Sequence, residues 1–238
     1  MKFGGGLILL AAASASAQTD EPPLIDYPPL PLVVSGIEGF ALPGWVVAAK
    51  AEGDLNRDGR ADLALALWTE AASRAEGYEE IRNTPPYRLV IAFARPNGGY
   101  RLIADNKTLL VPPAYSGTYE GGLDGDSLRI VRGSLDISRD LLRGHYRYRF
   151  RWSENAFRLV GYEYGGSDGA CITLASINYL TRRAKLEAMP ISEDNSRAVV
   201  RSVKRGPLAT LDQVSSLDFL ASGMGVIGNW PDCPRTEE

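Results

Sequence analysis

Alternation of aromatic and basic residues is the most regular pattern in this chain. From His145 to Trp152, the residues Tyr146, Tyr148, Phe150 and Trp152 occupy every second position, with His145 and three arginines between them. Successive side chains of a β-strand point to opposite faces. The pattern therefore predicts a strand whose aromatic face lies in the core and whose basic face meets solvent or a partner.

Further runs of apolar and β-branched residues predict strands along most of the chain. Short turn signals separate several of them, among them Asn97-Gly98 and Arg132-Gly133, and Asn-Gly supplies the positive φ angles of a hairpin turn. We expect a mainly β fold in which antiparallel hairpins build a sandwich or a partly closed sheet. The remaining predicted strands span 45–49, 62–68, 87–95, 100–105, 128–131, 134–138, 157–164 and 172–180.

Helical signals are few. Residues 70–82 are charge-rich and fit a short helix or a long loop. Between Thr210 and Ser222, apolar residues recur at near-helical spacing and Gly223 follows as a possible cap, which predicts one short C-terminal amphipathic helix. Long helices do not alternate with the strands, so a doubly wound α/β fold is not expected.

The N-terminus has the form of a secretory signal. Lys2 precedes an apolar run over residues 7–13, and Ala15-Ser16-Ala17 forms an A-x-A cleavage site. The run is too short to span a bilayer, and no later stretch of the sequence is long and apolar enough to do so. We expect cleavage after Ala17 and a periplasmic or secreted product; a retained N-terminus is the alternative.

Proline divides the exported chain into an arm and a domain. Five prolines fall within residues 18–33, where they favour extended or polyproline-like backbone. This segment is expected to be a linker, or an arm that packs on the domain edge. Residues 34–238 then form a single β-rich domain.

Composition excludes several kinds of site. The formal net charge is −3, whereas a general nucleic-acid binder is usually basic. The chain has a single histidine and two cysteines, too few residues for most zinc sites, for haem ligation or for a Cys–His nucleophile pair. Export would place Cys171 and Cys233 in an oxidising compartment, where we expect them to form a disulfide; two free buried thiols are the alternative.

The segment from Gly53 to Leu63 contains a pattern of hard oxygen donors, D-x-N-x-D-G-x-x-D. Calcium takes six or more oxygen ligands, and donors two residues apart can converge if the loop curls. The expected structural calcium site has side-chain ligands from Asp54, Asn56, Asp58 and Asp62 and a backbone ligand from Arg60. The alternative is a polar hairpin turn whose side-chain oxygens accept backbone N–H bonds.

This segment resembles the calcium loop of FG-GAP or VCBS-type repeats. Its flanks look like strands, and Leu65 stands where an EF-hand has glutamate, so an EF-hand is not expected. The four side-chain ligand positions match the repeat pattern one by one. Such repeats occur in series and build a propeller, but a single copy is visible here, so the resemblance implies a calcium loop and no propeller.

A broader resemblance involves residues 128–133, 146–152, 157–162 and 176–181. These stretches are similar to a group of exported bacterial proteins that carry an early D-x-[DN]-x-D-G loop. The resemblance implies a β-rich extracytoplasmic domain and assigns no chemistry to it.

One apparent catalytic motif does not fit its context. Gly165 to Gly169 matches the G-x-S-x-G nucleophile elbow, which requires a helix after the serine and a histidine downstream. The segment that follows Ser167 instead predicts a strand, and His145 lies upstream. We therefore expect a loop here, and no catalytic residue is assigned.

The basic face of the predicted strand from His145 to Trp152 has two interpretations. Arg147, Arg149 and Arg151 could be a solvated face with cross-strand ion pairs. They could instead form an anion-binding face for a polysaccharide, a lipid headgroup or an acidic protein.

We expect a non-enzymatic module that binds a protein or glycan of the cell envelope, with no nucleic-acid partner. The main alternative is a hydrolase of envelope polysaccharide or peptidoglycan that uses paired carboxylates, whose separation a sequence does not give. A third hypothesis is an inhibitor or assembly factor for an envelope enzyme.

Overall fold

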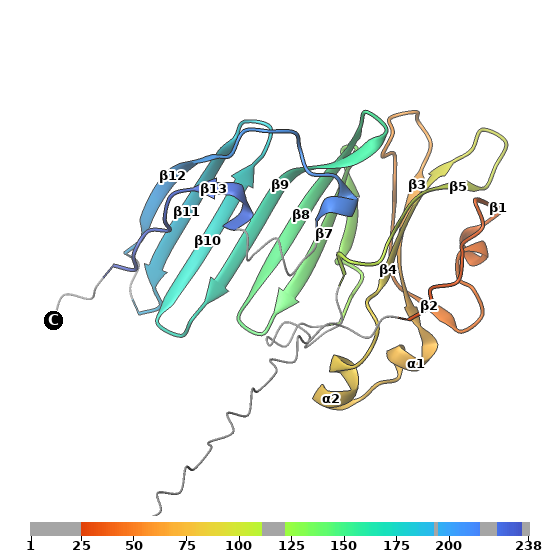
Figure 1. Ribbon diagram of the computed structural model, residues 1–238, viewed down its shortest axis with the longest axis horizontal. Coiled ribbons are helices and arrows are strands. Elements are labelled where there is room, and N and C mark those ends of the chain that lie inside the picture. The colour runs from red at the N-terminus through yellow and green to blue at the C-terminus, as the bar shows by residue number, and fades with distance from the viewer. Residues whose placement is uncertain (1–24, 111–121, 193–194, 215–222, 235–238) are drawn as a thin grey trace, which may run out of the picture.

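Two antiparallel β-sheets make up most of the molecule (Figure 1). The computed structural model describes residues 25–110, 122–192, 195–214 and 223–234. The expected mainly β fold with antiparallel hairpins is confirmed. The expected signal segment, residues 1–17, lies outside the described residues. No described helix is long and apolar enough to cross a membrane.

The smaller sheet has five strands in the order β1-β5-β4-β3-β2. The hairpin β2–β3 carries the D-x-N-x-D-G loop at its tip, and the hairpin β4–β5 closes over Asn97 to Gly99. The strands are β1 (Val33–Val34), β2 (Trp45–Gly53), β3 (Asp62–Thr69), β4 (Arg88–Ala94) and β5 (Tyr100–Asn106).

The larger sheet has eight strands, in the order β13-β12-β11-β10-β9-β8-β7-β6, so each strand pairs with its neighbours in the chain. Two of its hairpins turn on residues with positive φ, Arg132-Gly133 and Glu154-Asn155, as a two-residue hairpin turn requires. The strands are β6 (Leu128–Val131), β7 (Ser134–Leu141), β8 (Gly144–Ser153), β9 (Ala156–Ser167), β10 (Cys171–Asn178), β11 (Arg183–Pro190), β12 (Arg197–Val203) and β13 (Val226–Ile227).

Helices are short. The charge-rich segment forms α1 (Glu70–Ser73) and α2 (Gly77–Arg82), and single 3-10 turns occur at η1 (Ile37–Gly39), η2 (Leu211–Gln213) and η3 (Gly223–Gly225).

The C-terminal helix expected from Thr210 to Ser222 is described only at its start. Thr210 and Gln213 form a capping box around η2, but the backbone of Val214 is already extended, with φ −103° and ψ 115°. Leu211 and Val214 are both buried, so the apolar spacing serves core contact here. Residues 215–222 of the predicted helix lie outside the described residues.

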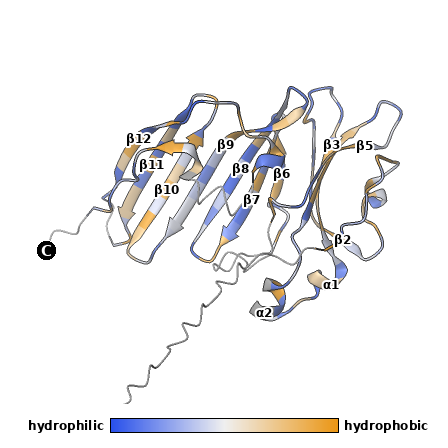
Figure 2. Ribbon diagram, viewed as in Figure 1, coloured by the Kyte–Doolittle hydropathy of each residue, from blue (hydrophilic) through white to orange (hydrophobic). Residues whose placement is uncertain are grey.

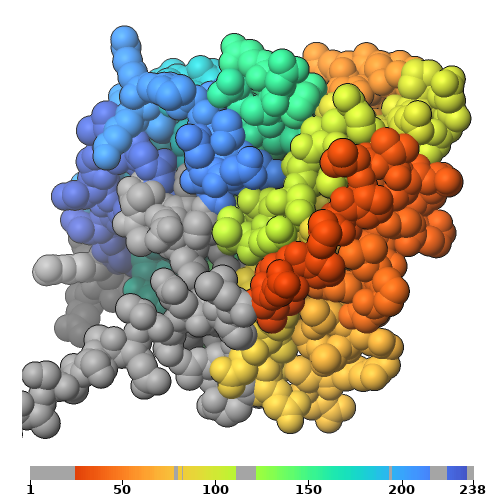
Figure 3. Space-filling view, turned by 45° about the vertical axis from the view of Figure 1, so that its right-hand side comes forward, coloured from red at the N-terminus to blue at the C-terminus, as the bar shows by residue number. Residues whose placement is uncertain are grey.

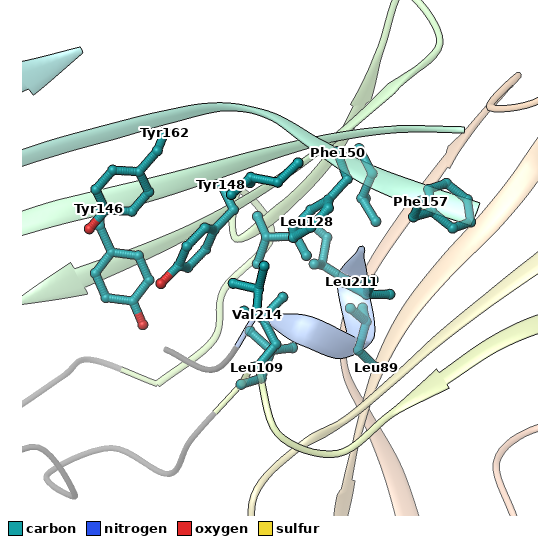
Figure 4. Packing of buried hydrophobic residues seen from close by; sticks show 14 of the residues in the cluster. Leu89, Leu109, Leu128, Tyr146, Tyr148, Phe150, Phe157, Tyr162, Leu211 and Val214 are labelled. Atoms are coloured by element: carbon teal, nitrogen blue, oxygen red, sulfur yellow. The ribbon is translucent and has the colours of Figure 1, made fainter. Parts of the chain in front are cut away.

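One core joins the two sheets. The aromatic face of β8 is buried as predicted, with Tyr148 and Phe150 fully inaccessible, and it packs with Leu211, Val214 and residues of the smaller sheet such as Leu89 (Figure 4). Burial of this apolar surface is the main stabilising contribution to the fold.

The smaller sheet is buried on both faces. Along β3, Ala64, Ala66 and Trp68 face the shared core, while Leu63, Leu65 and Leu67 face a second cluster. Residues of the N-terminal segment, including Val34 and Phe40, complete this second cluster. Burial on both sides explains why β3 is a continuous apolar run instead of an alternating one.

Residues 25–34, the described part of the proline-rich segment, contain no helix, and their end pairs with β5 (Figure 3). Arg88, which is 1 % exposed, donates to the Pro28 carbonyl at 2.6 Å and forms a two-bond ion pair with Asp105 at 2.6 and 2.7 Å. Burial opposes ionisation of Asp105, but the hydrogen bonds and charge of Arg88 outweigh it and lower the pKa of Asp105. Described residues 25–34 are therefore anchored to the sheet.

Candidate functional site

The loop between β2 and β3 is organised by its own side-chain oxygens. Asp54 accepts the backbone N–H groups of Asp58 and Gly59 at 3.0 and 2.9 Å, and Asn56 Oδ1 also accepts from Asp58 at 3.0 Å. Asp58 in turn accepts from the Arg60 backbone at 3.0 Å and pairs with the Arg60 guanidinium at 2.5 Å. These contacts form the polar turn that was the alternative to a metal site.

Asp62 has a different role from the other acidic residues of the loop. It is fully buried; its Oδ2 accepts from the Leu55 and Asn56 backbones at 2.9 and 3.2 Å, and its Oδ1 from Ala94 of β4 at 2.9 Å. Burial raises the pKa of Asp62, although the three N–H donors act in the opposite direction. Its carboxylate therefore ties the loop to the neighbouring hairpin.

The donor set fits calcium only in part. Among the described residues, no three His, Cys, Asp or Glu side chains are grouped as they would be around a metal ion. Asp54, Asn56 and Asp58 lie within one turn and contact one another's backbone, whereas both oxygens of Asp62 are directed at backbone N–H groups. Calcium binding by this loop stays a prediction.

We expect calcium to raise the melting temperature of the chain saturably, with an ion replacing the Arg60 guanidinium on Asp58. A ligand that binds only the folded state stabilises it by mass action. Asp58→Ala should abolish the effect, and a thermal-shift titration from chelator into calcium measures it. Asp58 is the informative position, because Asp62 supports the fold without metal. Equal melting temperatures in chelator and calcium would mean that the loop is a turn only.

The second candidate site lies on the outer face of the larger sheet, opposite its aromatic face. Figure 2 shows hydrophilic positions along β7 and β8. A hollow of about 210 Å³ crosses β8, β9 and β10 on this face. We call it the arginine groove; its polar lining comes from Arg147, Arg149, Arg151, Glu163, Ser176 and Asn178.

Cross-strand ion pairs hold two of the three arginines. Arg147 pairs with Glu163 of β9, which lies directly opposite. Arg149 makes two parallel hydrogen bonds to Asp136 of β7, at 2.7 and 2.6 Å, and Asp136 itself is 4 % exposed. Bidentate pairs of this kind fix the guanidinium plane. These contacts match the expected cross-strand ion pairs; they use Nε and Nη2 of Arg149, whose side chain is 43 % exposed.

Arg151 is in a different environment. Its register partner on β9 is Arg158, and the nearby carboxylate of Glu154 pairs with Arg158 at 2.6 Å. Among the described residues, the hydrogen bond that Arg151 makes is a long one, from Nε to Ser134 Oγ at 3.5 Å. Two like charges directly opposite each other are unfavourable.

Gly161 makes the hollow. It lies between Arg149 of β8 and Asn178 of β10 in the register, and the pairing shifts next to it, where Val160 is the extra residue of a bulge. A Cβ atom at Gly161 would meet Arg149 Cβ at 3.5 Å and the Ile177 carbonyl at 3.6 Å, both ordinary contacts. Any side chain larger than hydrogen would therefore project into the groove.

Gly161, Ser176 and Asn178 were not among the residues predicted for a site. A glycine inside a strand pattern is a known indicator of a bulge or of a close approach. That signal was present in the run from Phe157 to Tyr164.

The G-x-S-x-G segment has no elbow geometry, but the expected loop is wrong in part, because Gly165 to Ser167 belong to β9 and only the residues after Ser167 form the hairpin turn. Ser167 is the last residue of β9 and Cys171 the first of β10, and the Ser167 hydroxyl accepts the Gly169 N–H at 3.1 Å. His145 is exposed at the start of β8, opposite Gly165. A strand, not a helix, follows the serine, as expected.

Cys171 and Cys233 form the predicted disulfide, with their Cα atoms 6.1 Å apart. The bond joins the first residue of β10 to the C-terminal segment, where Trp230 packs edge-on against Tyr164 at 6.3 Å. Disulfides persist in oxidising compartments, so this bond fits an extracytoplasmic location.

Comparison with protein-family models, with curated proteins and with solved structures gives no match for this chain.

Proposed function

We propose that this chain is an exported, non-enzymatic binding module of the bacterial cell envelope, and that the arginine groove holds its ligand. The observation that carries the proposal is the groove itself, a hollow over Gly161 lined by three arginines, of which Arg147 pairs with Glu163 and Arg149 with Asp136. The disulfide and the signal-like N-terminus support export. A glycan suits the groove because its lining combines charged and polar side chains with apolar ones such as Val160 and Leu180, and a sugar ring offers both hydroxyl groups and C–H surface.

Co-sedimentation with purified peptidoglycan sacculi and with immobilised envelope polysaccharides tests this proposal. The wild-type chain should bind one of these polymers, and added salt should weaken binding, because exposed charges are screened. Arg151→Ala should reduce the bound fraction several-fold. Arg197→Ala is the matched control, since Arg197 is an exposed arginine of β12 outside the groove.

The same incubations test the hydrolase alternative. We expect no release of reducing ends or muropeptides over hours. Hydrolysis of these polymers by the wild-type chain would contradict a non-enzymatic role and support the paired-carboxylate hypothesis. An absence of binding to every polymer would contradict the proposed function.

A further inference from the structure

The positive charge of the arginine groove is unbalanced at one end. Asp136 and Glu163 neutralise Arg149 and Arg147, and Glu154 neutralises Arg158. Arg151 faces Arg158 across the strand pair, and among the described residues no carboxylate contacts it. An anion bound beside Arg151 would relieve this repulsion and would gain charge-assisted hydrogen bonds. A further donor on this face is Arg149, whose side chain is 43 % exposed and whose Nη1 the Asp136 pair does not use.

The other end of the groove offers neutral donors and acceptors. Ser176 is exposed, and its hydroxyl can both donate and accept. Asn178 accepts the Leu180 and Thr181 N–H groups through Oδ1, both at 3.0 Å, so its Nδ2 amine is the end left to donate. Glu163 adds an acceptor. Such a set suits a ligand with several hydroxyl groups.

The size of the groove limits what it can hold. Its volume of about 210 Å³ is below the roughly 300 Å³ at which pockets for drug-sized ligands begin. A single sugar ring is the scale of ligand that this volume accepts. Because both Ser176 and Asn178 are exposed at the rim, a ring held here can be one unit of a longer chain.

We propose that the arginine groove binds one hexuronic acid unit of an acidic polysaccharide. The sugar carboxylate lies against Arg151 and Nη1 of Arg149, and the ring hydroxyls face Ser176, Asn178 and Glu163. The inference rests on the proposed function and names the ligand class of the same site. The arginine groove then requires a ligand with one carboxylate on a hydroxyl-rich ring. This requirement distinguishes uronates from neutral sugars and from simple anions.

Calorimetric titration of the full mature chain with trigalacturonic acid tests the proposal. We expect saturable binding of the acid. The methyl ester of the same trisaccharide should bind with an affinity lower by about tenfold or more, because esterification removes a charge-assisted hydrogen bond. Arg151→Ala should cause a loss of similar size. Gly161→Leu should abolish binding, because its side chain would occupy the hollow, while its Cβ atom would make only ordinary contacts.

Two variants provide the controls. Gly125→Leu makes the same substitution at a glycine with open space around it, and Arg197→Ala removes an arginine outside the groove. Both should bind trigalacturonic acid as the wild type does. Melting temperatures of all variants identify any that fail to fold, and Arg151→Lys supplies a second test with the charge kept but the planar donor fork lost.

The outcomes separate this inference from the proposed function. Equal affinity for the acid and its methyl ester, binding unchanged in Gly161→Leu, or sodium phosphate binding as tightly as the trisaccharide would each overturn the uronate assignment. If trigalacturonic acid fails to bind but Gly161→Leu loses the sacculus or polysaccharide binding of the wild type, the ligand class is wrong and the binding function stands. If the wild type binds neither, both are wrong.

Discussion

Replacing Cys233 with serine is expected to lower the free energy of unfolding by about 4 kcal/mol, since a cross-link removes conformational entropy from the unfolded chain by an amount that grows with the logarithm of the loop length. The loop here spans 62 residues. The bond also holds the C-terminal segment, including Trp230, against the larger sheet. Urea unfolding of the oxidised wild type and of Cys233→Ser measures the difference.

Reduction provides the control for this prediction. Wild-type protein in dithiothreitol should unfold near the midpoint of Cys233→Ser, and the Cys171→Ser/Cys233→Ser double variant should add little. An unfolding midpoint that neither the substitution nor the reductant moves would mean that the two thiols are free in solution. That outcome would remove the strongest structural support for an oxidising compartment.

Asp62→Ala is expected to cost about 3 kcal/mol or more, because three backbone N–H groups lose one buried acceptor. These are the N–H groups of Leu55, Asn56 and Ala94, all within 3.2 Å of the carboxylate. Asp62→Asn keeps one acceptor oxygen in place and should lose about half as much. Thermal and urea unfolding in the presence of chelator measure the effect without any metal contribution.

Asp58→Ala is the matched control for Asp62, since it lies in the same loop. Its contacts are the Arg60 backbone and guanidinium and the Asn56 amide, on the exposed side of the loop. We expect a much smaller cost in chelator than for Asp62→Ala, because an exposed ion pair contributes little to stability. If Asp62→Ala and Asp58→Ala destabilised the chain equally under these conditions, the structural role given to Asp62 would be wrong.

Local patterns predicted strands β2 to β10 and the faces of β8, because a period of two residues translates directly into two sides of a sheet, whereas β1 and β11 to β13 were not predicted. Tyr146, Tyr148 and Phe150 are buried as that period requires. The turn chemistry at Arg132-Gly133 was also visible, since positive φ at successive residues is a local property.

The arginine groove was only half visible in the sequence. The arginine side of β8 was evident, but the hollow depends on which residues of β9 and β10 lie opposite it. Gly161 stands beside Arg149 because of a bulge, and a bulge shifts the register in a way that alternation alone does not specify. The opposition of Arg151 and Arg158 has a different origin, because it lies on the turn side of the bulge and follows from the two-residue turn at Glu154-Asn155, which sets Ser153 opposite Ala156.

The role of Asp62 illustrates the same limit. The D-x-N-x-D-G pattern indicated a curled loop of side-chain oxygens, and Asp54, Asn56 and Asp58 do cap that curl. One partner of Asp62, however, is the N–H of Ala94, which is 32 residues away in the sequence. A contact between separate hairpins is set by packing, and no local spacing reports it.

The central claim is that the outer face of the larger sheet binds an envelope glycan and does not cleave it. Backbone amide NMR of the isotope-labelled mature chain, titrated with the polysaccharide fraction that it retains, tests both parts at once. Shifts should concentrate at residues 147–151, 160–163 and 176–180, while the sugar signals show no new reducing ends. Shifts clustered on another face, or the appearance of cleaved product, would contradict the account.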